Sequence, residues 1–193
     1  MKYRSVWIAQ TGVFLALLIA AQIVTRPLGN TFVTGSVTNL LLILTVMVCG
    51  LSSAIALSVI SPFFATLIGI GPLWPFIPVI IAANLALVTL WRLIAFRHTN
   101  TNDAAGFARR NSNIEKLAAA LVIAALVKFL VLYTGIVKLV VPHILMIEEP
   151  QASAVSAAFS WPQLITATVG GLLAILIFPV LSKALPRNKF LIL

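Results

Sequence analysis

The stretch that decides the fold runs from Pro27 to Trp91, PLGNTFVTGSVTNLLLILTVMVCGLSSAIALSVISPFFATLIGIGPLWPFIPVIIAANLALVTLW. These 65 consecutive residues contain no Asp, Glu, Lys or Arg. As one straight helix they would extend about 98 Å, roughly three times the thickness of the hydrocarbon core of a bilayer. The stretch must therefore fold back on itself within a membrane.

Two breaks divide this stretch into three helices. Residues 49–53, CGLSS, form a short interruption, and residues 71–78, GPLWPFIP, contain three prolines that no straight helix accommodates. Uncharged spans on either side are also long enough to cross a bilayer. The sequence predicts an all-α membrane protein, a six-transmembrane-helix bundle in one domain (1–193), with helices at about 6–24, 32–49, 51–69, 78–96, 114–141 and 161–181.

Composition supports this class. Hydrophobic residues make up 61% of the chain and charged residues 9%, which excludes a disordered chain and disfavours a water-soluble domain. Secretory signals also begin with basic residues, as this chain does at Met1–Arg4. The apolar span that follows is long for the core of a signal, so we interpret this span as the first membrane helix. The lone Cys49 forms no internal disulfide and is interpreted as a packing residue.

The basic residues predict the orientation. Placing both termini in the cytoplasm brings ten of the thirteen basic residues to the cytoplasmic face: Lys2, Arg4, Arg92, Arg97, Arg109, Arg110, Lys116, Lys183, Arg187 and Lys189. This asymmetry and anionic lipid account for the net charge of +9, so no nucleic-acid partner is expected. The predicted location is the prokaryotic plasma membrane, as a multi-pass protein in the lipid bilayer.

The chain lacks the usual signs of an enzyme or a motor. His98 and His143 fall in separate loops, all four acidic residues lie in loops or at helix ends, and there is no phosphate-binding loop for ATP. Glu148-Glu149 is followed by Pro150 and is interpreted as surface. We expect no enzymatic activity, no metal and no cofactor in this chain. A hydrolase that uses Glu148 or His143 remains a rival reading.

Lys128 is the most informative residue. It lies in the apolar segment KLAAALVIAALVKFLVLYTG, residues 116–135, where a lysine costs about 2.5–3.5 kcal/mol to insert. One reading is an ammonium that faces a cavity and receives an anionic ligand. The other is a lysine that extends toward water or pairs with protein carbonyls. Without an acidic side chain at that depth, the anionic ligand is favoured.

Other groups extend the candidate site. Asn84 and Asn39 are amides within predicted helices, where they either bind a ligand or join two helices by hydrogen bonds. The aromatic residues near the outer face form either a lid or the ordinary interfacial belt. Gln163 faces the same cavity if its helix is suitably rotated. The candidate substrate-binding residues are Lys128, Asn84, Asn39, Trp74, Phe76, Tyr133, His143, Trp161 and Gln163.

Small residues recur every four positions on the first helix. Gly12, Ala16 and Ala20 make a smooth stripe that another helix could approach closely. The stripe serves either packing within the bundle or docking to another subunit. Gly170-Gly171 on the last helix is interpreted as internal packing.

Three segments carry a family resemblance: Ala16-x-x-x-Ala20, VTGSVTNLL at 33–41, and GPLWPFIPVIIAANLAL at 71–87. With six helices in under 200 residues, the chain resembles the substrate-binding S component of energy-coupling factor (ECF) vitamin transporters. The resemblance implies a subunit that binds a vitamin from outside and topples in the membrane to release it. It also implies a transmembrane T component as partner, docked on the Ala-x-x-x-Ala motif, and two cytoplasmic ATPase subunits that use ATP.

The chain is most similar to the pantothenate-specific members of that family. Lys128 and Arg26 favour a substrate with a carboxylate, and Asn84 favours one that also carries amide or hydroxyl groups. Pantothenate has all of these groups. Folate meets the same requirement for an anion, whereas thiamine and hydroxymethylpyrimidine do not need it. The main rival is a membrane scaffold or accessory subunit without a small ligand.

Overall fold

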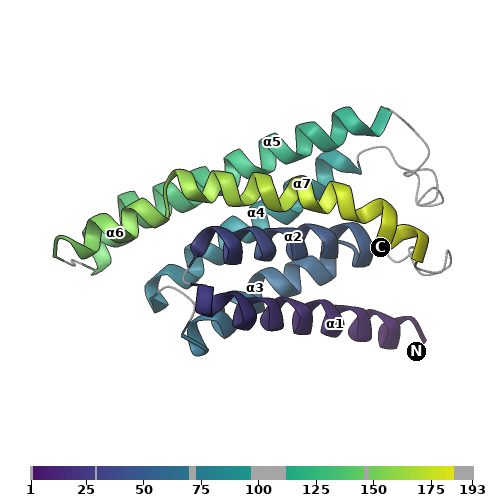
Figure 1. Ribbon diagram of the computed structural model, residues 1–193, viewed down its shortest axis with the longest axis horizontal. Coiled ribbons are helices and arrows are strands. Elements are labelled where there is room, and N and C mark those ends of the chain that lie inside the picture. Colours follow the sequence, from purple (N-terminus) through teal and green to yellow (C-terminus); the bar gives the residue numbers. More distant parts are fainter. Residues whose placement is uncertain (1, 29, 70–72, 97–111, 146–147, 185–193) are drawn as a thin grey trace.

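The computed structural model describes residues 2–28, 30–69, 73–96, 112–145 and 148–184. Residues 97–111, which include His98, lie outside the described residues, as do Arg187 and Lys189. Within the described residues the secondary structure is helical throughout (Figure 1). The elements are α1 (Lys2–Thr25), η1 (Arg26–Leu28), α2 (Thr31–Cys49), α3 (Leu51–Leu67), η2 (Trp74–Phe76), α4 (Ile77–Ala95), α5 (Ser112–Leu132), η4 (Tyr133–Leu145), α6 (Gln151–Ala158) and α7 (Trp161–Ala184).

Local chemistry sets several of the helix boundaries. The Asn30 side chain caps α2 by accepting a hydrogen bond of 2.9 Å from the Phe32 N–H. Pro78 lies in the first turn of α4, where its missing N–H costs nothing. Just after α3, Gly69 has φ of 69°, a left-handed conformation that terminates helices and favours glycine.

Each of the six predicted helices has a counterpart in the structure. α3 has 17 residues and is shorter than predicted, because the left-handed turn at Gly69 follows it. α5 continues as the wider π-type helix η4, so this span reaches Leu145. The short helix α6, which precedes α7, was not predicted from the sequence.

Among the described residues, five helical spans are long and apolar enough to cross a membrane, and α3 is a shorter apolar helix. Large hydrophobic side chains face outward along the bundle. Val24 of α1 is 73% exposed and Val180 of α7 is 70% exposed. Such surfaces are stable against lipid and would associate in water. The chain is therefore a multi-pass membrane protein.

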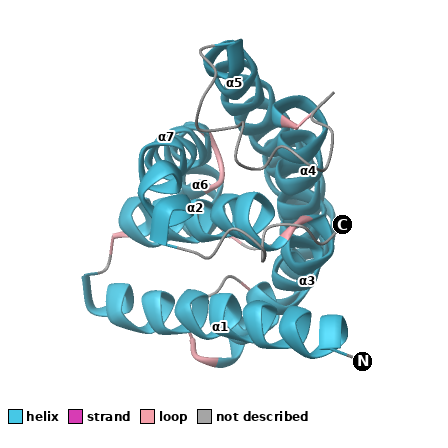
Figure 2. Ribbon diagram, turned by 90° about the vertical axis from the view of Figure 1, so that its right-hand side faces the viewer, coloured by secondary structure: helices cyan, strands magenta, loops and turns pink. Residues whose placement is uncertain are grey.

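The bundle is built around α2, which is the most buried of the five spans, while α1 is the least buried. Figure 2 shows α1 along one side of the bundle and α5 at the opposite side. Gly170 lets α7 approach α2 closely, because a Cβ there would lie 2.6 Å from the Ser36 carbonyl oxygen. The interpretation of Gly170-Gly171 as internal packing is confirmed.

Two apolar cores lie at opposite ends of the bundle. The larger core, around Leu42 and Trp91, occupies the end that holds the start of α1 and the end of α7 (Figure 1). The smaller core, around Phe76 and Ile136, occupies the end near α6. The compartment that each end faces remains a prediction. Between the two cores lies a layer of polar side chains that contains the candidate site.

Candidate functional site

A cavity of about 460 Å³ lies between the two cores. That volume falls within the range of pockets for small molecules, about 300–1,000 Å³. Its walls come from α1, α2, α3, α4 and α5, with Phe159 and Gln163 from the α6–α7 region. Exposed residues such as Arg26 and Asn30 belong to the lining, so the cavity reaches the surface. Each of these helices lines the cavity with the half of its length that lies toward the α6 end of the bundle.

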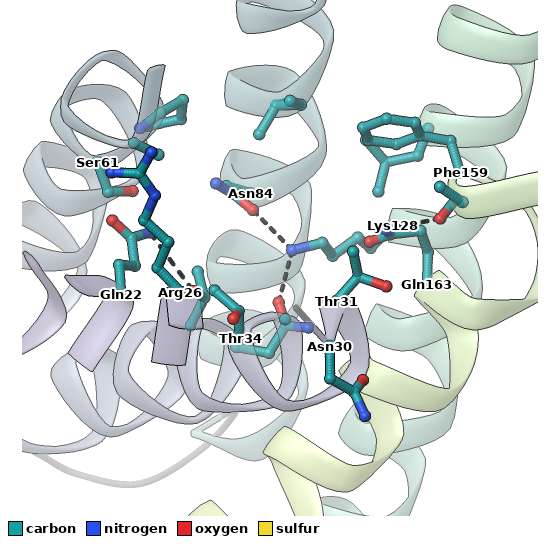
Figure 3. A pocket seen from close by; sticks show the side chains of 18 of the residues that line it. Gln22, Arg26, Asn30, Thr31, Thr34, Ser61, Asn84, Lys128, Phe159 and Gln163 are labelled. Carbon is teal, nitrogen blue, oxygen red and sulfur yellow. Dashed lines mark hydrogen bonds between the residues drawn. The ribbon is translucent and has the colours of Figure 1, made fainter. Parts of the chain in front are cut away.

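Lys128 is the central group of the cavity. Its side chain is only 4% exposed, and its Nζ donates to the Asn39 Oδ1 at 2.5 Å and to the Asn84 Oδ1 at 2.7 Å (Figure 3). The ammonium therefore does not extend toward a headgroup region. It is fixed between α2, α4 and α5 by two neutral amides, with one of its three N–H donors left for a further acceptor.

The positive charge of Lys128 has no acidic neighbour in the cavity. Among the described residues that line it, none is Asp or Glu, and Arg26 adds a second cation. Amide oxygens satisfy hydrogen bonds but do not neutralise a charge, and a buried charge is costly unless it is paired. The electrostatics of the lining therefore favour a negatively charged occupant.

The two asparagines are held in defined orientations. Asn39 is 2% exposed, and its amide nitrogen donates to the Thr166 hydroxyl of α7 at 3.4 Å. Asn84 is also 2% exposed, and Figure 3 shows its oxygen turned toward Lys128 and its nitrogen turned away. Each of the two amides thus both binds Lys128 and connects helices. The hydrogen bonds join helices, as one of the two interpretations expects, and both asparagines also line the cavity, so their part in binding a ligand stays a prediction.

Sequence reasoning missed several of the polar residues that line the cavity. Gln22 of α1 is 6% exposed, and its amide nitrogen donates to the Thr38 hydroxyl at 3.5 Å. Ser61 of α3 is 1% exposed and also belongs to the lining. Both are polar side chains within apolar helices, the same signal that identified Asn84. The other missed polar lining residues are Asn30, Thr31 and Thr34.

The α6 end of the cavity is covered by an aromatic contact. Phe159, at the end of α6, lines the cavity and packs against Phe76, with ring centroids 5.5 Å apart. Phe76 is 1% exposed and belongs to the smaller core. Gln163 of α7 lines the cavity, and its amide nitrogen donates to the Ala158 carbonyl at 3.1 Å. This bond fixes the bend between α6 and α7.

The structure divides the predicted substrate-binding residues into two groups. Lys128, Asn84, Asn39 and Gln163 meet at the cavity. The aromatic residues and His143 lie outside its lining. Trp74 and Trp161 are 57% and 61% exposed, a placement typical of an interfacial belt. Tyr133 stacks on Phe129 and lies beneath Lys138, whose Nζ is 5.6 Å from the ring centroid; His143 is exposed.

The stripe on α1 faces away from the bundle. Gly12, Ala16 and Ala20 are all exposed, and a Cβ added at Gly12 would meet no atom within 4 Å. Packing inside this bundle is therefore not the role of the stripe. On the inward side of the same helix, Thr11 and Ser53 of α3 share a hydroxyl hydrogen bond of 2.8 Å.

The described residues of the lining provide cations, amides and hydroxyls, which can form hydrogen bonds with a small ligand. No protein-family model matches the chain, and neither the curated proteins nor the solved structures give a match.

Proposed function

We propose that this chain is the substrate-capture subunit of an ECF-type importer and that it binds a carboxylate-bearing vitamin, with pantothenate as the first candidate. The observation that carries the proposal is the buried Lys128 ammonium, which lines a cavity of vitamin size without an acidic residue in the described lining. A ligand carboxylate would neutralise that charge and accept its remaining N–H.

The position of the cavity agrees with capture from outside. Its lining lies toward the end of the bundle opposite the start of α1 (Figure 1). The distribution of basic residues predicts a cytoplasmic N terminus. On these two grounds we propose that the mouth, with Arg26, lies at the external face. There Arg26 would attract an anion before Lys128 receives it.

Delivery in this proposal depends on partners. The chain carries no phosphate-binding loop, so energy would come from two cytoplasmic ATPase subunits. A transmembrane T component would dock on the exposed stripe of Gly12, Ala16 and Ala20, where the absence of large side chains allows close helix approach. We propose no enzymatic reaction for the chain itself.

A binding titration with the purified protein tests the proposal. Pantothenate should bind the wild type, and Lys128→Met should weaken binding at least about 30-fold, since loss of one partner of a buried charge pair costs about 2–5 kcal/mol. Lys138→Met is the matched control, because Lys138 is exposed and does not line the cavity. Folate and thiamine, titrated in parallel, separate a pantothenate site from other vitamin sites.

A mass spectrum of the small molecules retained by the purified protein supplies an independent readout. An anionic compound that Lys128→Met loses and Lys138→Met keeps would support the proposal. Equal binding of every vitamin by wild type and Lys128→Met would contradict the role of Lys128. A protein that binds none of them and retains no small molecule would instead be a scaffold or accessory subunit.

A further inference from the structure

Apolar side chains line the cavity next to Lys128. Leu132 follows Lys128 by four residues on α5, and Ile80 precedes Asn84 by four residues on α4. Residues four apart share one face of a helix, so each apolar side chain lies about one turn, roughly 6 Å, from its polar neighbour. Ile80, Leu132 and Phe159 all line the cavity and pack in the smaller core, and we call these three residues the apolar wall. The apolar wall therefore lies on the α6 side of the Lys128 ammonium.

Hydroxyl-bearing residues border the ammonium from a different side. The helix α2 contributes Thr31, Thr34 and Thr38 to the lining. Figure 3 shows Phe159 and Thr34 on opposite sides of the Lys128 side chain. A ligand beside Lys128 thus has hydrocarbon on one side and threonines on another.

The Lys128 ammonium lies at the inner end of the cavity. On α2, α4 and α5, the lining residues farthest from the α6 end are Asn39, Asn84 and Lys128. A ligand whose charged group reaches Lys128 must therefore extend toward the apolar wall. Water against hydrocarbon is unfavourable, so an apolar group that displaces this water gains free energy. A small inorganic anion would neutralise the ammonium without covering the apolar wall.

We infer that the apolar wall selects a carboxylate that carries an apolar group about one helical turn from its charged end, and that this ligand lies with its carboxylate innermost. The carboxylate contacts Lys128, and the apolar group lies against Ile80, Leu132 and Phe159. The inference rests on the proposed function, because it assigns the orientation and the second contact of the same ligand. Pantothenate meets the requirement through two methyl groups on a carbon remote from its carboxylate. Inorganic anions and short hydroxy acids do not meet it.

Two ligands and a pair of variants test this assignment. The probes are pantothenate and its analogue in which two hydrogens replace the two methyl groups. Wild type should bind the analogue about 4- to 15-fold more weakly, because the analogue covers less of the apolar wall. Ile80→Ala should weaken pantothenate binding and should reduce the advantage of pantothenate over the analogue at least about twofold. Leu93→Ala is the matched control, since it removes the same number of carbons at a position of α4 that is 58% exposed.

The outcomes separate this inference from the proposed function. Wild-type protein that binds both compounds equally, through binding that Lys128→Met removes, overturns the inference alone, and this result needs no variant of the apolar wall to fold. Phe159→Ala is a second variant of the wall with the same expected loss. An advantage for pantothenate that neither Ile80→Ala nor Phe159→Ala reduces also overturns the inference. Failure of wild type to bind pantothenate overturns the proposed ligand and, with it, the role of the apolar wall.

Discussion

The Nζ of Lys128 in α5 donates a hydrogen bond of 2.7 Å to the Oδ1 of Asn84 in α4, although the two residues are 44 positions apart in the sequence. Asn39 of α2 accepts a second bond from the same nitrogen. Three helices are therefore tied together at one ammonium. Because both acceptors are neutral amides, the arrangement orients the charge without neutralising it.

Removing one of these amides should destabilise the protein. Asn84→Leu deprives the buried ammonium of an acceptor, so we expect the free energy of unfolding in mixed micelles to fall by about 1–3 kcal/mol. In the Lys128→Met background the same change should cost less. A coupling energy of about 1.5–3 kcal/mol from the double-mutant cycle would measure the bond. Additive effects of the two substitutions would mean that the bond contributes nothing to stability.

The close approach of α7 to α2 predicts that substitutions at different glycines change the stability of the protein by very different amounts. Gly170→Leu places a Cβ against the Ser36 backbone and should lower the free energy of unfolding by about 1–3 kcal/mol or prevent folding. Gly12→Leu is the matched control, because a Cβ there meets no atom within 4 Å. Gly12→Leu should leave the melting temperature of the isolated subunit unchanged or raise it. A similar loss in both variants would argue against tight packing at Gly170.

The exposed stripe on α1 predicts a variant that binds but does not transport. Ala16→Trp adds bulk to an outward-facing position, so ligand affinity of the isolated subunit should stay within about twofold of wild type. Uptake of the vitamin by cells that also express the proposed T component and ATPase subunits should be lost. Ala157→Trp, an exposed position on α6, is the control and should transport normally. Normal uptake by Ala16→Trp would mean that the stripe is not the docking surface.

Thiol labelling tests the orientation in the membrane. Cys49 is 5% exposed, so the wild type should react little with a membrane-impermeant maleimide. Gln151→Cys on α6 should be labelled on intact cells, and Lys183→Cys near the end of α7 only after permeabilisation. Both positions are exposed, and they lie at opposite ends of the bundle (Figure 1). The reverse pattern would place the cavity mouth in the cytoplasm.

The fold could be predicted from the sequence because a bilayer imposes simple requirements on length and polarity. Uncharged spans of sufficient length identify the helices, and proline and glycine identify most of their ends. The short helix α6 escaped prediction, since Gln151–Ala158 is neither long nor strongly apolar. The end of α3 was misplaced by two residues because the conformation of Gly69 cannot be read from residue type alone.

Residues of the candidate site could be predicted from the sequence where a polar side chain lies in an apolar helix, because burying such a side chain costs free energy. Lys128 and Asn84 stand out for that reason, and both line the cavity. Gln22 carries the same signal but lies two residues after Ala20, in a segment that we interpreted only through its small residues. The aromatic residues were selected by type and depth. Whether such a residue lines a cavity depends on helix rotation, which a single sequence does not specify, and Trp74 faces outward.

α1 carries two surfaces on opposite sides. Gln22 follows Ala20 by two residues, which is about 200° around a helix. The outward-facing stripe and the inward-facing Gln22 therefore belong to the same helix, and Arg26 follows this helix directly in η1. A helix that is displaced moves all of its side chains together, so in the proposed importer a T component that displaces the stripe would also shift side chains of α1 that line the cavity. Binding and release of the ligand would then be coupled through the displacement of α1.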